Sequence, residues 1–416
     1  MIMQDNEKKP ALRFKGFTDP WEQRKLGDAF ERVVRKNTNN ESRLPLTISA
    51  QDGLVDQITY FNNRVASRDV SNYYLVYNGE FAYNKSTSDG YPFGAVKRLD
   101  WYEKGVLSTL YIVFALKHPE KDDSDFMTVF YDTDRWHRGV AERAAEGARN
   151  HGLLNISADD FFDIDTTMPE DKVEQEKIGR LLKKLDTLIT LHQRKYERLV
   201  NIKKSMLDKM FPKNGASVPE IRFKGFTDPW EQRKLGEIAK EVVRNDPASD
   251  APIMMITAGN GFIEQSDRYA FNNAGESLKK YILLECGELA YNHGASKLRP
   301  YGSCFALTTV EKARIPFVYH CFSVEKSNPE FLSIELNGAN VENQLRKIVS
   351  SGARMDGLLN IAYSEYTEVT VQLPKKEEQD WIAKFFKHLD TLITLHQRKL
   401  EKLQNIKKSC LEKMFV

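Results

Sequence analysis

The residues best suited to chemistry are polar and cationic side chains that stand beside aromatic residues and glycine in two loops. The first loop begins at Ala82-Tyr-Asn-Lys-Ser86, and the second at Ala290-Tyr-Asn-His293. Asn, Lys, Arg and His can bond to base edges and phosphate oxygens, so this combination predicts contact with nucleic acid. A polar hairpin turn without a ligand is the alternative. The candidate DNA-binding residues are Asn84, Lys85, Lys97, Arg98 and Arg149 in the first half of the chain, and Asn292, His293, Lys297, Arg299 and Arg354 in the second.

The sequence lacks the motifs of the common enzyme classes. No glycine is followed by lysine, which excludes a P-loop, and no histidine is followed by glutamate, which excludes the HExxH zinc motif. No two prolines are adjacent, so the Asn/Asp-Pro-Pro-aromatic signature of amino-methyltransferases is missing too. The four cysteines form no CxxC pair and indicate free thiols rather than a zinc site or a disulfide framework. We therefore expect a non-enzyme with no catalytic residue and no metal site.

The candidate loops belong to a chain that is duplicated in tandem. Arg13–Gly27 and Arg222–Gly236 are the same fifteen residues, and Leu185–Lys195 is repeated as Leu389–Lys399. The segments between these blocks differ widely, apart from short islands such as Gly-Leu-Leu-Asn-Ile. The alternative is a duplicated structural domain whose copies have accumulated substitutions evenly. Even substitution would not leave the blocks identical while the segments between them diverge. The repeat thus predicts two modules on one common frame that recognise different things.

Each repeat predicts a mixed α/β domain that is followed by a long helix. Pro169 and Pro374 are each followed by acidic residues, a pattern typical of helix starts. The expected organisation is a first domain at residues 1–168, a first helix at 169–211, a second domain at 212–373 and a second helix at 374–416.

Apolar residues follow a heptad spacing through both predicted helices, and helices of this length need to bury such a stripe. Each helix follows its own domain, so an antiparallel coiled coil of the two would place the domains at opposite ends, as a dumbbell with a pseudo-twofold axis. The two histidines in the stripe are interpreted as polar residues that set the register, and not as catalytic groups. The predicted seam residues are Ile178, Leu182, Leu185, Ile189, His192 and Leu199 in the first helix, and Ile382, Phe386, Leu389, Ile393, His396 and Leu403 in the second.

Charge is placed unevenly along the chain, whose formal net charge is +2. Residues 170–211 and 375–415 each carry a net charge of +4, which leaves −6 for the remainder. A DNA-binding protein with such weakly acidic domains would share the phosphate contacts with a partner protein. The longest apolar stretch, Val106–Leu116, is too short to span a membrane and predicts a buried strand. The polar N-terminus has no signal-peptide core, so we expect a cytoplasmic protein without membrane contact.

The repeated blocks resemble those of a known family. A block like FKGFTDPWEQRKLG before each variable domain, and a segment like NIKKSMLDKMF at the end of each helix, occur in the same order in both halves. This arrangement resembles the specificity subunit of type I restriction–modification systems, and the resemblance covers essentially the whole chain.

The resemblance implies a division of labour. Each variable domain would be a target recognition domain that reads one half of a split site in double-stranded DNA, and the helices would fix the gap between the half-sites. Two modification subunits would bind S-adenosylmethionine and methylate adenine, and two restriction subunits would use ATP and Mg. No cofactor is expected in this chain itself. Because the two variable domains differ, the full target is expected to be asymmetric.

Two other functions remain open at the level of sequence. A coiled-coil adaptor could bind proteins through two variable domains and never contact DNA. A subunit of a system that only methylates, with no restriction partner, would share the same frame.

Overall fold

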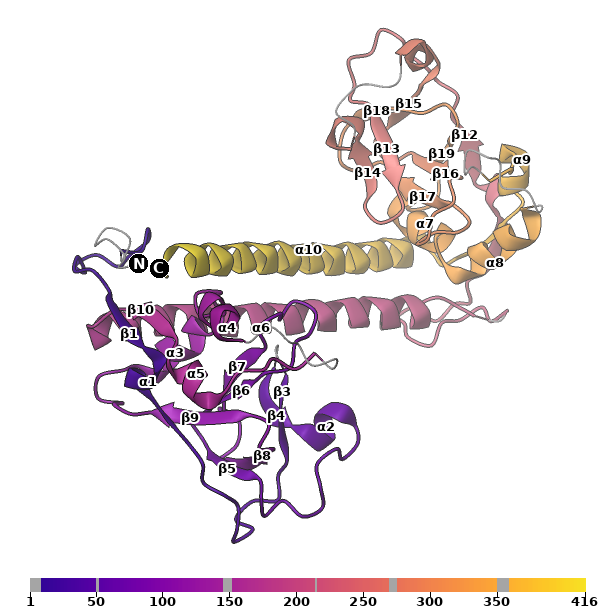
Figure 1. Ribbon diagram of the computed structural model, residues 1–416. Helices are drawn as coiled ribbons and strands as arrows, with labels where there is room; N and C mark the ends of the chain where they lie inside the picture. The colour runs from indigo at the N-terminus through magenta and orange to yellow at the C-terminus, as the bar shows by residue number, and fades with distance from the viewer. Residues whose placement is uncertain (1–8, 50–51, 145–151, 214, 269–274, 350–358) are drawn as a thin grey trace. The chain divides into compact units, whose positions relative to one another are not determined.

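The computed structural model describes residues 9–49, 52–144, 152–213, 215–268, 275–349 and 359–416. The chain divides into two compact units: unit 1 contains Met1–Arg194 and Gln397–Val416, and unit 2 contains Lys195–His396. Each unit combines a domain of strands and short helices with segments of both long helices (Figure 1). The predicted fold class, mixed α/β domains in tandem, is confirmed.

The centre of unit 1 is a four-stranded antiparallel sheet with the strand order β2-β9-β6-β7. Successive residues of a strand point to opposite faces of a sheet, so each face builds its own core. Phe81 and Tyr83 pack with the helices, whereas Ala82 packs with the hairpins on the other face. The elements are β1 (Glu22–Lys25), α1 (Leu26–Ala29), β2 (Phe30–Arg32), β3 (Leu46–Ser49), β4 (Gly53–Asp56), α2 (Gln57–Phe61), β5 (Tyr74–Tyr77), β6 (Phe81–Asn84), β7 (Ala95–Arg98), β8 (Lys104–Leu107), β9 (Ile112–Leu116), α3 (Ser124–Phe130), α4 (His137–Arg143), α5 (Ala158–Phe162), β10 (Asp165–Met168) and α6 (Lys172–Lys209).

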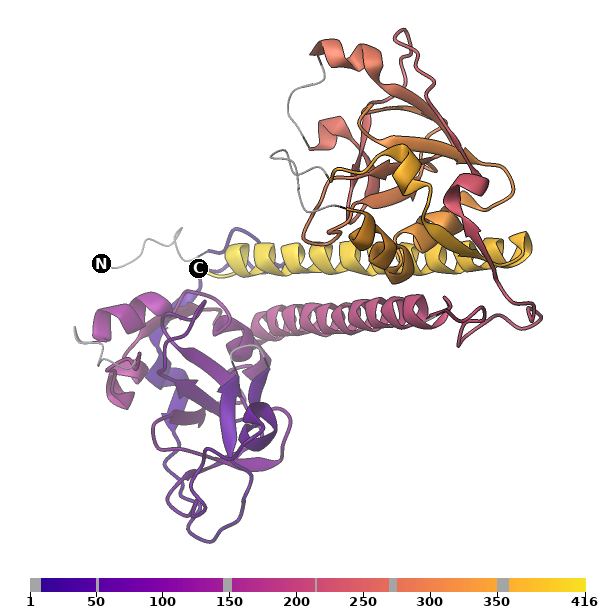
Figure 2. The same cartoon turned by 90° about the vertical axis from the view of Figure 1, so that its right-hand side faces the viewer.

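The strand pairs β3–β4 and β5–β8, together with α2, form what we call the outer lobe of unit 1. In both Figure 1 and Figure 2 the pair β5–β8 lies on the side of the central sheet that faces away from α6. The outer lobe contributes Leu46, Val76 and Leu107 to the second core, beside Ala82 and Val113 of the central sheet. The lobe is therefore a stable part of the domain and not a loose loop.

Unit 2 repeats this topology strand for strand. Its central sheet has the order β12-β19-β16-β17, with the pairs β13–β14 and β15–β18 as its outer lobe. Leu289 and Tyr291 pack with the helices, and Ala290 packs with the hairpins, as in unit 1. The elements are β11 (Glu231–Lys234), η1 (Leu235–Glu237), β12 (Ala239–Glu241), β13 (Met254–Thr257), β14 (Gly261–Glu264), η2 (Gln265–Asp267), η3 (Gly275–Lys280), β15 (Ile282–Glu285), β16 (Leu289–Asn292), β17 (Ser303–Ala306), β18 (Lys312–Ile315), β19 (His320–Val324), α7 (Pro329–Leu336), α8 (Ala339–Ile348), α9 (Tyr363–Tyr366), β20 (Thr370–Leu373) and α10 (Lys376–Lys413).

The two long helices, α6 and α10, contain 38 residues each and lie where the sequence predicts them. Within each unit the end of one helix packs against the beginning of the other, so the segments run antiparallel. The ion pairs between Lys407 and Asp186 in unit 1 (2.6 Å) and between Lys203 and Asp390 in unit 2 (2.5 Å) are equivalent contacts of the repeat. None of the helices in the described ranges is both long and apolar enough to cross a membrane.

The first turns of each long helix are buried in a globular domain as well as against the other helix. Ile178, Leu182 and Leu185 lie in the same core as Phe126 of α3. The equivalent residues Ile382, Phe386 and Leu389 lie in the corresponding core of unit 2. Further along the stripe, the side chains are half-buried: Ile189, His192, Leu199, Ile393, His396 and Leu403. The stripe thus contributes first to domain packing, and the role of His192 and His396 in setting the register stays a prediction.

The apolar stretch Val106–Leu116 is not one strand, and in this respect the sequence-based expectation is wrong. It contributes the end of β8 and all of β9, and a turn closed by the Tyr111 amide and the Ser108 carbonyl (3.2 Å) separates them. β8 pairs with β5 in the outer lobe, whereas β9 pairs with β2 and β6 in the central sheet. A continuous apolar run therefore crosses from one core to the other.

Candidate nucleic-acid interface

The predicted DNA-binding residues of unit 1 cluster at the hairpin between β6 and β7, which is held by three anchors. The Tyr83 hydroxyl donates a hydrogen bond to the Phe93 carbonyl (2.8 Å), and the Asn84 side chain accepts one from the Ser86 amide (3.0 Å). Gly94 has a φ of +77°, and a Cβ there would lie 2.1 Å from the Asn84 carbonyl oxygen. Only glycine fits at this return position. These anchors fix the loop on the sheet.

The hairpin between β16 and β17 of unit 2 has the same anchors and different loop residues. The Tyr291 hydroxyl donates to the Tyr301 carbonyl (2.7 Å), and the Asn292 side chain accepts from the Gly294 amide (2.9 Å). Gly302 has a φ of +82°, and a Cβ there would lie 2.7 Å from the Asn292 carbonyl oxygen. The frame of the hairpin is therefore common to both units, while the residues that it presents differ.

The described residues of the repeated Gly-Leu-Leu-Asn-Ile segments, 152–156 and 359–361, lie beside these hairpins. The Leu154 amide donates to the Lys85 carbonyl (3.0 Å), and the Leu359 amide donates to the His293 carbonyl (2.9 Å). The same backbone contact thus joins the island to the hairpin in both units. The candidate arginines Arg149 and Arg354 precede these segments and lie outside the described residues.

Three candidate cations of unit 1 are bound by the protein itself. The Lys85 ammonium donates to the Ile156 carbonyl (3.3 Å), and Lys97 forms an ion pair with Asp132 (2.9 Å). The Arg98 side chain is 9% exposed and pairs with two carboxylates, those of Asp100 (2.6 Å) and Asp125 (2.8 Å). These contacts position the hairpin and its sheet against α3 and the segment that follows it.

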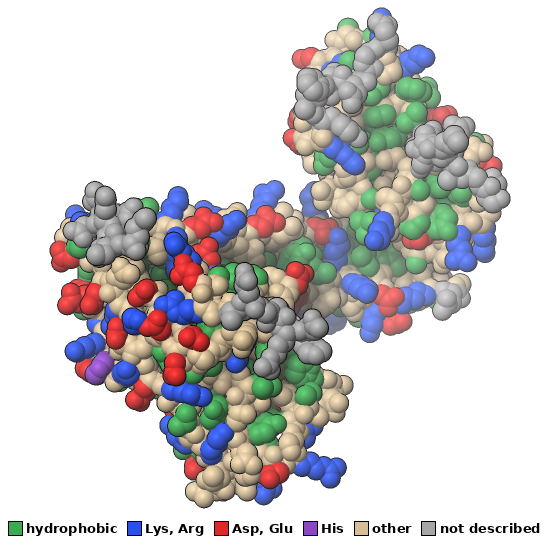
Figure 3. Space-filling model, in the orientation of Figure 1, with side chains coloured by type: hydrophobic (Ala, Val, Ile, Leu, Met, Phe, Trp, Pro, Cys, Tyr) green, Lys and Arg blue, Asp and Glu red, His purple; other side chains and the backbone are tan. Residues whose placement is uncertain are grey.

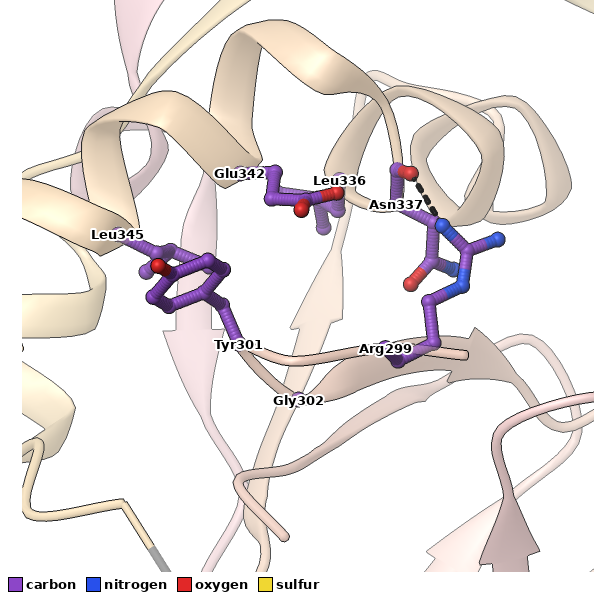
Figure 4. A pocket seen from close by; sticks show the side chains of 7 residues that line it. All are labelled: Arg299, Tyr301, Gly302, Leu336, Asn337, Glu342 and Leu345. Carbon is purple, nitrogen blue, oxygen red and sulfur yellow. Dashed lines mark hydrogen bonds between the residues drawn. The ribbon is translucent and has the colours of Figure 1, made fainter. Parts of the chain in front are cut away.

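The candidates of unit 2 divide into buried and exposed side chains. Both ring nitrogens of the buried His293 lie within hydrogen-bonding distance of carbonyl oxygens, those of Leu359 (2.8 Å) and Val318 (2.7 Å). The Arg299 guanidinium donates to the Asn337 carbonyl (2.7 Å) and lines a small hollow beside α7 and α8 (Figure 4). Burial lowers its pKa. Lys297 is exposed, so among the described candidates its ammonium is the best placed to reach a phosphate.

The structure also presents an aromatic pair that the sequence analysis did not single out. Tyr60 and Phe61 lie exposed on α2, in the outer lobe of unit 1. A signal for them exists in the sequence, because Phe-Asn-Asn occurs at residues 61–63 and again at residues 271–273.

Glu335 of α7 is a buried carboxyl group whose pKa burial raises to about 7, although hydrogen bonds from Gln372 and Asn340 oppose the shift. Between pH ~4.5 and ~7 the folded chain keeps a proton that the unfolded chain releases, so the free energy of unfolding falls as the pH rises through this window. Glu335→Gln should therefore stabilise unit 2 by up to about 3 kcal/mol above pH 7 and flatten this pH dependence.

Urea unfolding at pH 5 and pH 8 measures the effect of Glu335→Gln. Glu330→Gln on the same helix is the control, because Glu330 pairs with Lys387 at the surface. Parallel pH profiles for the two variants would contradict the prediction.

Comparison with known proteins identifies the fold. Residues 227–405 match the family described as "Type I restriction modification DNA specificity domain". The chain is similar to the S subunit of a type I restriction–modification system from M. genitalium, with a TM-score of 0.56 and 14% identity over 98% of this chain and 99% of that one. It also aligns with an HsdS subunit from Thermoanaerobacter tengcongensis over 95% of this chain and 96% of that one, with a TM-score of 0.41 and 15% identity. Residues 227–405 therefore carry a type I restriction–modification DNA specificity domain, and the first half of the chain is built on the same frame of strands.

Proposed function

We propose that this chain reads a bipartite, asymmetric DNA target, one half-site with each unit, and directs adenine methylation and restriction by partner subunits. The observation that carries the proposal is the contrast between frame and loops. The two units share their strand order and the anchors of their hairpins, but the hairpin residues differ. A common frame with different exposed residues suits two related readers of different base sequences.

In this proposal the domains read the DNA and the helices set the spacing. Side chains of the hairpins and outer lobes read base edges and DNA shape, and cations such as Lys297 contact phosphates. The paired helices set the distance between the two readers. Because DNA advances about 3.4 Å per base pair, a rigid helical spacer of this kind selects the number of bases between the half-sites.

The identical block at the start of each domain is the surface that we assign to two modification subunits. Only Trp21 and Leu26, and their counterparts Trp230 and Leu235, are buried in it. Surface residues usually tolerate substitution, so the fold alone does not require identity at the exposed positions of the block. Arg24 illustrates the point: it pairs with the buried Asp122 in unit 1, whereas its counterpart in unit 2 pairs with the exposed neighbouring Glu231. Two equal surfaces suit two copies of one partner.

The chemistry belongs to the partner chains in this proposal. A modification subunit would bind S-adenosylmethionine and turn the target adenine out of the duplex, since a stacked base cannot be reached. Restriction subunits would bind ATP and Mg. This chain contributes recognition and spacing and no catalytic residue.

A chimera within the chain tests the proposal. Residues 28–184 are replaced with residues 237–388, so that each junction falls at the edge of an identical block and the start of the helix keeps the domain against which it packs. Sequencing of modified adenines in cells with the modification subunit should show the wild-type first half-site replaced by a second copy of the other half-site.

The reciprocal chimera is the matched control and should yield two copies of the first half-site. Adenine methylation at the same sites in cells from which this chain is deleted would overturn the proposal. The alternative, an adaptor that binds only proteins, predicts no salt-dependent affinity of the wild-type complex for duplex DNA.

A further inference from the structure

The outer lobe of unit 1 exposes an ordered aromatic pair on α2. The side chains of Tyr60 and Phe61 are each 50% exposed, and their rings contact edge to face with centroids 5.0 Å apart. Ile58 and Val65 lie exposed in the same segment. Large apolar side chains gathered on a surface in this way usually mark a binding site.

Polar contacts, and not a hydrophobic core, hold this turn in place. The Asp56 side chain caps α2 by accepting hydrogen bonds from the Ile58 amide (3.0 Å) and the Thr59 hydroxyl (2.6 Å). The Gln57 side chain accepts from the Ala66 amide (2.6 Å), which closes the segment on itself. The two rings are therefore presented on a fixed support, which lowers the entropic cost of binding a ligand.

Two arginines and two aspartates accompany the aromatic pair along the chain. Arg64 and Arg68 are both exposed, and Asp56 and Asp69 stand at the two ends of the segment. The Arg64 guanidinium also donates to the Ser67 carbonyl (3.0 Å). Asn62 and Asn63 are also exposed, and Asn62 adopts a left-handed conformation (φ +52°) that ends the helix. On the face of the molecule in Figure 3, the lower part of unit 1 carries green apolar side chains with blue Lys and Arg and some red Asp and Glu side chains near them. This combination of types suits phosphates, base edges and base faces together.

We propose that Tyr60 and Phe61 form an aromatic wedge that enters the DNA groove at the first half-site, with Arg64 and Arg68 on the flanking phosphates. Proteins that deform a duplex insert apolar side chains between base steps, and aromatic rings stack on any base. Because insertion separates two stacked base pairs, affinity for the first half-site should depend on how easily that base step deforms. The proposal rests on the proposed function and names a contact that the hairpin candidates do not supply.

The test uses the complete chain in complex with its modification subunit and a duplex containing the target found by methylation sequencing. Tyr60→Ala/Phe61→Ala should weaken binding about 10- to 100-fold, given the usual contribution of a stacked aromatic side chain. Tyr60→Phe keeps the ring and should bind within about twofold of wild type. Trp101→Ala, which removes a single ring that is 72% exposed elsewhere on unit 1, should also leave binding unchanged.

Two further readouts separate a wedge from an ordinary surface contact. 2-Aminopurine placed at successive steps of the first half-site should brighten at one step with wild type and stay dark with Tyr60→Ala/Phe61→Ala. Arg64→Gln/Arg68→Gln should reduce the slope of log affinity against log salt by about 2.

The failures of the two proposals can be told apart. A wild-type complex that binds no specific duplex refutes the proposed function. A wild-type complex that binds its target, beside a double-alanine variant that binds equally well, refutes only the wedge. Loss of the modification subunit from the double-alanine variant would assign the aromatic pair to a protein contact and would also overturn the wedge.

Discussion

Replacing Phe415 with alanine is expected to destabilise unit 1 by about 3–5 kcal/mol, the usual range for a buried phenylalanine. Phe415 is the next-to-last residue of the chain, yet it is buried in the core of the first domain. Its ring stacks on Phe126 (centroids 5.5 Å apart) and contacts the edge of Trp21 (6.1 Å). Truncation leaves a cavity between the two aromatic residues. Hydrogen exchange with mass spectrometry should show faster exchange in peptides that contain Trp21 and Phe126.

Phe211 supplies the matched control, because it occupies the equivalent position in unit 2. Its ring stacks on Phe331 (5.8 Å) and contacts Trp230 (5.8 Å). Phe211→Ala should speed exchange in peptides around Trp230 and Phe331 and leave those of the first domain unchanged. Equal effects of both variants on both units would contradict the assignment of each helix end to one domain.

Arg13→Ala is expected to cost about 3–5 kcal/mol, because it would leave a buried carboxylate without its partner. The side chain of Glu174 is 1% exposed, and the Arg13 guanidinium binds both of its oxygens, at 2.6 and 2.8 Å. The same fork joins Arg222 to Glu378 in unit 2, at 2.7 and 2.6 Å. Urea unfolding of the two alanine variants should show losses of similar size in the respective units.

Two controls separate the charge from the packing at this site. Arg13→Lys should recover only part of the loss, since an ammonium group cannot reproduce the two-pronged contact. Arg13→Met/Glu174→Met removes both charges and should be more stable than Arg13→Ala. An Arg13→Ala variant as stable as wild type would show that water satisfies Glu174 and that the pair does not hold the first block to α6.

The candidate site was only partly accessible from the sequence. Residue types in the sequence predicted that the two hairpins contain the site. The structure shows that both hairpins have the same anchors, at Tyr83 and Tyr291. The ion pairs of Arg98 with Asp125 and of Lys97 with Asp132 could not be foreseen, because these partners lie 27 and 35 residues away along the chain. A lysine or arginine in a loop looks the same in the sequence whether its partner is a DNA phosphate or a carboxylate of its own domain.

The sequence by itself determined the features that depend on short-range pattern. The tandem repeat follows from identity, and α6 and α10 follow from apolar spacing and helix-start signals that act within a few residues. Only the tertiary structure decided which segments the apolar residues of these elements pack against. The first turns of α6 are buried against Phe126, and Val106–Leu116 divides between two cores. These outcomes depend on contacts between segments far apart in the chain, and local residue patterns do not specify such pairings.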